Sequence, residues 1–246
     1  AVLIVKDWPP HYNLLYSVGR SKGSKHLMNE IPLFPLNTVL FPGMPINLHI
    51  FEPRYKEMIR YCLETQSPFG VVLIREGDEA LGPLADPYPI GCTAQITHME
   101  QLENDHLDVF AVGLERFHIH GLSYDQPYLT GMIEVLPFEM DHDSQHLIQA
   151  GTRLRPLVER YLAVLSEAAE EVEFDSTQLP NDPMALAYLA ATVVQIPAAQ
   201  KQELLATGEA TELLADIRTI YQREVPLLRA ILQHSPHDEM GMFSLN

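Results

Sequence analysis

Between residues 31 and 137, the apolar and polar positions follow the patterns of short β-strands. Ile46–Phe51 and Cys92–Met99 alternate apolar and polar side chains, as strands with one buried face do. Phe69–Ile74 is a continuous apolar run and predicts another strand. A hairpin through residues 104–105 and further strands are predicted at Leu107–Val112, Arg116–His120 and Tyr128–Leu136. Several short strands at close spacing indicate a small barrel or sandwich.

Prolines interrupt the first apolar pieces of this region, Ile31–Leu36 and Thr38–Phe41. Because proline has no N–H to donate to a strand ladder, we expect both pieces at sheet edges or strand starts. A turn is predicted at 41–45, where Pro and Gly are adjacent. Pro53 then opens a helix, since apolar residues follow at helical spacing: Tyr55, Met58, Ile59, Cys62 and Leu63.

Beyond residue 141 the pattern becomes helical. Asp143 or Ser144 can cap a first helix with apolar positions from Leu147 to Leu165, and Pro156 should kink or split it. Asp182-Pro183 is a typical helix start. The later helices are predicted at 183–196, 198–207 and 211–233, with a bend at Pro226 in the last.

The order of elements predicts an α+β protein. We expect a flexible leader at 1–30, a β-barrel subdomain at 31–137, an α-helical bundle subdomain at 138–235 and a tail at 236–246. Residues 31–137 carry a net charge of −9 and residues 138–246 carry −10. No shift in composition and no linker separates them, so the two parts should pack together.

Charge excludes some partners. The chain has 16 basic and 33 acidic residues, a net charge of −17. A nucleic acid or an anionic membrane surface would be repelled. Cys62 and Cys92 show no metal-type or disulfide spacing, so we expect reduced, buried thiols in a cytoplasmic protein. The longest apolar runs are far shorter than the roughly 20 residues that span a bilayer.

One long segment, Ile31–Tyr55 (IPLFPLNTVLFPGMPINLHIFEPRY), closely resembles the opening of the N-terminal substrate-binding domain of Lon proteases. Three later segments fit the same family in the same order: Ile90–Ile96, Val112–Phe117 and Lys201–Leu205. The resemblance implies a PUA-like β pseudo-barrel with one inserted helix, followed by an α-helical bundle. It extends over about residues 31–233.

The resemblance is to the recognition domain alone. The sequence has no phosphate loop of the form GxxxxGK followed by Ser or Thr, and no Ser-Lys protease module, so we expect no enzyme activity and no cofactor. The resemblance to the Lon substrate-binding domain implies binding of unfolded or hydrophobic polypeptide segments, as an adaptor, holdase or quality-control factor. One alternative is an assembly or structural factor with one dedicated protein partner. Another is RNA binding through the barrel, which the −9 charge of residues 31–137 disfavours.

Phe41 and Met44 flank the predicted turn and are the candidate protein-binding residues. An apolar side chain at a turn has less core available to it, and methionine adapts to varied partners. The alternative is that both side chains fold inward and close one end of the barrel.

Four further residues are interpreted as structural. Glu52 and Arg54 flank the helix start at Pro53, where a carboxylate is favoured by the helix dipole. Phe117 is expected in the core, with Arg116 bound to a carboxylate or a backbone carbonyl.

Histidine spacing and nucleophile motifs give no site. His118/His120, His142/His146 and His234/His237 each offer two imidazoles, whereas a zinc site needs three or four ligands. The sequence has no G-x-S-x-G motif, and neither cysteine has a histidine beside it. We therefore expect neither a metal site nor nucleophilic catalysis.

Overall fold

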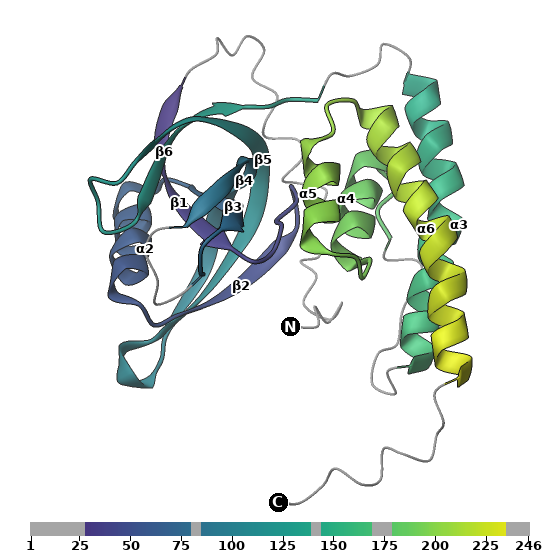
Figure 1. The fold of residues 1–246 in the computed structure, drawn as a ribbon, viewed down its shortest axis with the longest axis horizontal. Helices are drawn as coiled ribbons and strands as arrows, with labels where there is room; N and C mark the ends of the chain where they lie inside the picture. The colour runs from purple at the N-terminus through teal and green to yellow at the C-terminus, as the bar shows by residue number, and fades with distance from the viewer. Residues whose placement is uncertain (1–27, 80–84, 139–143, 169–178, 235–246) are drawn as a thin grey trace, which may run out of the picture.

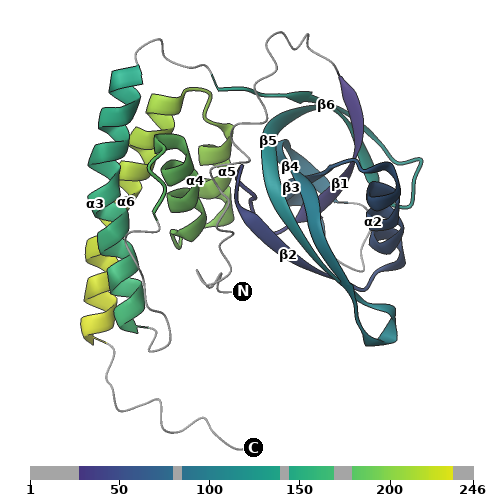
Figure 2. The same cartoon turned by 180° about the vertical axis from the view of Figure 1, so that it is seen from behind.

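The computed structural model describes residues 28–79, 85–138, 144–168 and 179–234, which form a β-barrel beside a helical bundle (Figure 1). The view from behind shows the same two halves, with α4 and α5 between the barrel and the helix pair α3 and α6 (Figure 2). The α+β class and the order of β-strands before helices confirm the prediction from sequence. No described helix is long and apolar enough to cross a membrane.

Five strands close into a ring in which each pairs with its neighbours: β5, β4, β3, β1 and β6, which returns to β5. They span Asn29–Leu36 (β1), Phe69–Glu76 (β3), Asp86–Gln101 (β4), Leu107–Ser123 (β5) and Leu129–Val135 (β6). The sixth strand, β2 (Pro45–Ile50), lies outside the ring and pairs with the first third of β5. A single long strand, β5, therefore contacts β2, β4 and β6.

Several strand predictions need correction. The pieces Leu107–Val112 and Arg116–His120 belong to the one strand β5. Thr38–Phe41 forms no strand. β1 begins at Asn29, inside the segment expected to be a leader, whereas residues 1–27 lie outside the described residues.

β1 lies between two strands rather than at an edge, against the expectation from its prolines. Its first half pairs with β6 from Asn29 to Leu33, and its second half pairs with β3 from Leu33 to Leu36. Only Leu33 occurs in both registers. Each proline thus occupies a stretch that is paired on one side, where a missing N–H is tolerated.

Helix α2 (Pro53–Thr65) confirms the predicted helix and four of the five positions of its apolar stripe; the fifth, Leu63, is 40% exposed. Tyr55, Met58, Ile59 and Cys62 are buried. The predicted hairpin turn is also confirmed, with Asn104 and Asp105 both at positive φ near 60°. Asparagine and aspartate tolerate this left-handed conformation better than most residues.

The bundle consists of α3 (Ser144–Ala168), α4 (Pro183–Val193), α5 (Ala198–Ala206) and α6 (Ala210–His234). The Asp182 carboxylate accepts from the Ala185 N–H at 2.8 Å, so the predicted N-cap is confirmed. α4 ends at Val193, three residues before the predicted end. Pro156 lies inside α3 without splitting it, and the possible caps before Ser144 lie outside the described residues.

Arg116 on β5 joins the barrel to the bundle, although its side chain is almost fully buried. Its guanidinium donates to the carbonyls of Leu205 (2.9 Å) and Thr207 at the end of α5. Its Cζ lies 3.6 Å from the ring centroid of Phe138. The last carbonyls of a helix lack intrahelical donors and carry negative partial charge, so a buried cation is stabilised there. This confirms the expected backbone-carbonyl partner.

A further hydrogen bond ties the same halves together. Gln202 of α5 donates through Nε2 to the Ile90 carbonyl of β4 at 2.9 Å. The Phe117 ring, fully buried as predicted, fills the barrel where β3 and β4 carry glycines. A Cβ at Gly70 or Gly91 would lie 2.7 or 2.6 Å from that ring, so both positions require glycine.

Arg116→Ala should lower the free energy of unfolding by about 2–4 kcal/mol, because two buried carbonyls lose a charged donor. Arg116→Lys should recover less than half of this loss, since one ammonium cannot reproduce the planar fork and its stacking. Urea unfolding measures both. Arg60→Ala, at an exposed position on α2, is the control and should change the value by no more than about 0.5 kcal/mol. Equal stability of the Arg116 and Arg60 variants would contradict this role.

Lys201 gives a pH-dependent prediction. Burial lowers its pKa to about 8, and its ammonium donates to the Thr192 carbonyl at 2.6 Å. Because the folded pKa lies below the unfolded value, protonated Lys201 opposes folding, fully below pH 8 and less as the pH rises toward 10.5. Relative to Lys201→Met, the wild-type protein should gain about 1–2 kcal/mol of unfolding free energy between pH 7.5 and 10. A difference that stays constant with pH would contradict the lowered pKa.

Candidate functional site

Phe41 and Met44, the candidate binding residues from sequence, are fully buried. The turn they flank is fixed to β5: Gly43 N–H donates to the Gly113 carbonyl (2.7 Å), and Gly113 N–H donates to the Met44 carbonyl (2.9 Å). The Phe41 ring lies 6.1 Å from that of Tyr188 on α4. Both side chains therefore belong to the core, and the binding interpretation is wrong for this pair. The alternative, in which they fold inward, agrees with the structure.

The strand-to-helix junction has the expected structural character. Arg54 Nε lies 2.9 Å from Glu52 Oε2, and both side chains are largely buried. The Arg54 guanidinium also lies 4.7 Å from the ring centroid of Tyr55. The Glu52 carboxylate makes no capping hydrogen bond, but its carbonyl accepts from the Tyr55 and Lys56 N–H groups. The pair fixes the direction in which α2 leaves β2.

The thiols are poor nucleophiles. Cys62 and Cys92 are free and buried, as predicted. Burial raises the pKa of Cys62 to about 11 and raises that of Cys92 as well. Both thiols are therefore protonated near neutral pH, whereas the thiolate is the reactive form.

The histidine pairs do not assemble into a metal centre among the described residues, where no group of three or more suitable ligands occurs. The rings of His118 and His120 lie 4.8 Å apart, and His120 Nε2 lies 2.7 Å from Glu134 Oε2. His142 and His237 lie outside the described residues, as does the side chain of His234.

The outer edge of β2 is a candidate binding surface, because β2 pairs with β5 and has no other neighbour among the described strands. Gly113 N–H donates to the Met44 carbonyl where β2 begins, and the register then continues without a bulge. In such an antiparallel ladder every second residue bonds to the partner strand. The alternate residues Asn47 and His49 therefore direct their N–H and C=O groups toward the open side.

Side chains hold this edge in place without covering its backbone. His49 Nδ1 lies 2.7 Å from Asp108 Oδ1, and His49 Nε2 lies 3.1 Å from Nδ1 of His106. Lys56 Nζ of α2 donates to the Asp105 carboxylate at 2.8 Å. These contacts link β2, the hairpin turn and α2, and so fix the position of β2 relative to both.

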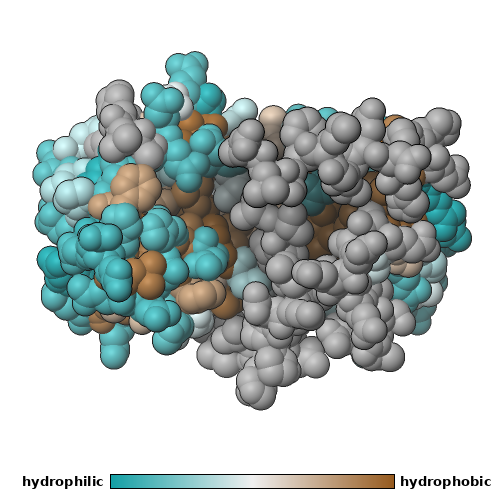
Figure 3. All heavy atoms as spheres, turned by 90° about the horizontal axis from the view of Figure 1, so that it is seen from below, coloured by the Kyte–Doolittle hydropathy of each residue, from teal (hydrophilic) through white to brown (hydrophobic). Residues whose placement is uncertain are grey.

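Exposed apolar side chains lie at the end of β2 and on its partner strand β5. Phe110 is directly opposite Asn47 in the register and is 39% exposed, and Phe51 follows β2 with 42% exposure. Seen from below, the barrel half shows apolar surface among hydrophilic side chains (Figure 3). Sequence reasoning missed this edge, because the strand order that leaves β2 outside the ring is not visible in a hydropathy pattern.

Comparison with known families identifies the chain. Residues 30–223 match the model of the ATP-dependent protease La (LON) substrate-binding domain. The chain belongs to this family. A Lon protease of Parabacteroides distasonis is 28% identical over 230 residues, covering 90% of this chain and 27% of the relative. One of Anaeromyxobacter dehalogenans is 26% identical over 203 residues, covering 81% and 24%. The chain thus spans about a quarter of the length of these relatives.

Solved structures show the same LON substrate-binding fold. A Lon N-terminal domain protein from Xanthomonas campestris has a TM-score of 0.57 and 23% identity, covering 85% of this chain and all of that one. The N-terminal domain of a Mycobacterium avium complex Lon protease has a TM-score of 0.61 and 18% identity, covering 79% and 98%. These matches, like the family model, concern the recognition domain.

The double substitution Phe41→Ser, Met44→Ser should lower the free energy of unfolding by more than about 4 kcal/mol, because each exchange opens a cavity and buries a hydroxyl. Denaturant unfolding measures this. Tyr61→Ser, Leu63→Ser, at exposed positions on α2, is the matched control and should cost much less. A melting temperature that is unchanged in the Phe41, Met44 variant would contradict their assignment to the core.

Proposed function

We propose that this LON-family chain binds extended polypeptide segments at the open edge of β2, without catalysis of its own, as an adaptor or holdase in protein quality control. The observation that carries the proposal is that no described strand pairs with the side of β2 to which the backbone of Asn47 and His49 is directed. Membership of a substrate-binding domain family supports polypeptide as the ligand.

The chemistry of the edge fits strand addition. An extended peptide can donate to and accept from Asn47 and His49, so its backbone supplies affinity that does not depend on its sequence. Exposed edges are usually blunted by lysine, by an inward charge or by proline. β2 has no charged residue other than His49 when it is protonated, and its one proline is at its first position. This edge therefore lacks the usual protection.

The neighbouring aromatic rings provide the apolar part of the contact. Phe51 directly follows β2 and Phe110 lies one strand further in on β5, each with about 40% of its surface exposed. A peptide that places apolar side chains on these rings would remove apolar surface from water, which favours binding by roughly 25 cal/mol per Å². Unfolded segments with alternating apolar residues are the expected ligands, since alternate side chains of a strand point to one face.

Charge distribution disfavours RNA as the ligand of this surface. Residues 31–137 contain five basic and fourteen acidic residues. Of the five, Lys56 and Arg75 form ion pairs with aspartates, and Arg116 is buried. A phosphate backbone finds no cluster of cations here.

Asn47→Pro tests strand addition. The substitution removes an N–H that faces the open side, and proline is tolerated at such an edge position. Binding of a fluorescein-labelled 12-residue peptide of alternating valine and threonine should weaken by about three- to tenfold, since a hydrogen bond is lost and the ring obstructs approach. Fluorescence anisotropy measures the dissociation constant.

The controls isolate the backbone. Asn47→Ala retains the N–H and should bind within twofold of the wild-type protein. A peptide with N-methylated alternate amides should bind weakly to all three proteins. Equal affinity of the proline and alanine variants would show that this edge does not bind the peptide. Purification of bound proteins from native cells then separates a broad client range from a single dedicated partner.

A further inference from the structure

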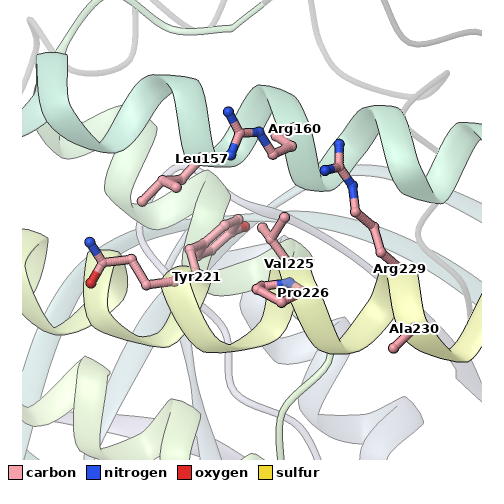
Figure 4. Close-up of a pocket in the computed structure, with 8 residues that line it drawn as sticks. Leu157, Arg160, Tyr221, Val225, Pro226, Arg229 and Ala230 are labelled. Atoms are coloured by element: carbon pink, nitrogen blue, oxygen red, sulfur yellow. The ribbon is translucent and has the colours of Figure 1, made fainter.

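The helix pair α3 and α6 lines an open cavity of about 480 Å³ (Figure 4), on the side of the bundle that faces away from β2 in Figure 1. Leu157 of α3 and Tyr221 and Val225 of α6 give it apolar walls. Tyr221 points toward α3 in Figure 4, and its hydroxyl donates to the Ala190 carbonyl of α4 at 3.0 Å. The wall is therefore rigid and tied to the core.

Two arginines flank this cavity. Arg160 comes from α3 and Arg229 from α6, and Figure 4 shows both guanidinium groups on the α3 side of the cavity. Pro226 also lines it and has no N–H, so it cannot donate to the carbonyl of Gln222, four residues earlier. Cationic donors thus lie beside an apolar surface.

Helical spacing extends the basic surface along both helices. Arg153, Leu157 and Arg160 follow at i, i+4 and i+7 on α3, so they lie on one face. On α6 the same face carries residues at i, i+4, i+7 and i+11: Arg218, Gln222, Val225 and Arg229. We call the surface formed by these seven residues the arginine groove.

The arginines of the groove differ from the other basic residues of the bundle. Arg155, Lys201 and Arg223 each have hydrogen-bond partners. Within the described part of the chain, the four groove arginines have no hydrogen bond or ion pair, and Nε of Arg218 is buried without a partner. Four cations that have no partner among the described residues, on one surface of a chain with net charge −17, repel one another and attract anions.

We propose that the arginine groove binds an acidic amphipathic helix of a partner protein. Its acidic side chains would pair with Arg153, Arg160, Arg218 and Arg229, and its apolar side chains would cover Leu157 and Pro226, which keep accessible surface, whereas Val225 is buried beneath them. Arg153 and Arg160 are seven residues apart, or about 11 Å along the helix axis, which matches carboxylates two turns apart on the ligand. This site is separate from the β2 edge and does not depend on the function proposed for that edge.

A polypeptide fits the groove better than a nucleic acid. The apolar walls offer a ligand apolar contact between the arginines, which a phosphate backbone cannot use. Residues 138–246 as a whole carry −10, so a long polyanion would meet repulsion beyond the groove, whereas a short acidic helix would not.

The test uses the full chain and a labelled 15-residue helical peptide with glutamate and leucine on one face. Its affinity, measured by anisotropy, should fall at least tenfold in Arg160→Glu, Arg229→Glu and by a smaller factor in Arg160→Gln, Arg229→Gln. Arg60→Glu, Arg75→Glu changes the net charge equally at exposed positions on the barrel and should bind within twofold of the wild-type protein. Circular dichroism melting checks that all variants remain folded.

Further measurements decide the ligand class. Raising NaCl from 50 to 500 mM should weaken binding several-fold, because exposed ion pairs are screened. A matched lysine peptide should bind at least tenfold more weakly, and Asn47→Pro should leave the affinity unchanged. No binding of the acidic peptide, equal binding of the lysine peptide or full binding by Arg160→Glu, Arg229→Glu would overturn the proposal.

Two other occupants are distinguished in the same assay. Binding of a 15-nucleotide RNA that equals the peptide in affinity and in its dependence on Arg160 and Arg229 would make the groove a polyanion site and overturn the proposal. The chain's own acidic residues Glu170, Glu171, Glu173 and Asp175, replaced by Gln or Asn, should leave peptide affinity within twofold. Tenfold tighter binding in that variant would assign the groove to this segment instead.

Discussion

The contact of Arg116 with the end of α5 is the constraint on which the two-part architecture depends. It places a cation, 3% exposed, between the barrel and the bundle, where the free carbonyls of Leu205 and Thr207 accept its donors. The strand that carries Arg116 also pairs with β2, β4 and β6. The strand β5 therefore positions the open edge, closes the barrel and binds the bundle. A substitution of Arg116 should for this reason affect all three.

Local patterns predicted local structure well. The stripe of α2, the Asp182 cap and the turn at Asn104 and Asp105 each depend on residues a few positions apart, and all are confirmed except for Leu63 of the stripe, which is exposed. Patterns failed where distant residues decide the outcome. The prolines of β1 are tolerated because two partner strands each take half of it. The turn carrying Phe41 and Met44 is buried because Gly113 binds its backbone.

Both candidate binding surfaces, the β2 edge and the arginine groove, also depend on contacts between residues that are distant in sequence. The β2 edge is open because the ring closes between β5 and β6 without it, and the arginine groove exists because α3 and α6, far apart in sequence, lie side by side. The net charge of −17 gave no indication of a basic surface. Four arginines without partners among the described residues nevertheless lie along these two helices. The distribution of charge, rather than its sum, selects ligands.

Amide hydrogen exchange of the full chain, with and without a saturating peptide of alternating valine and threonine, tests the central claim most directly. Strand addition to β2 predicts that the N–H groups of Asn47 and His49 exchange quickly in the free protein and are protected when peptide is bound. Ile46 and Leu48, which already face β5, should change little. If the peptide binds while Asn47 and His49 exchange at unchanged rates, the open edge of β2 is not where polypeptides bind.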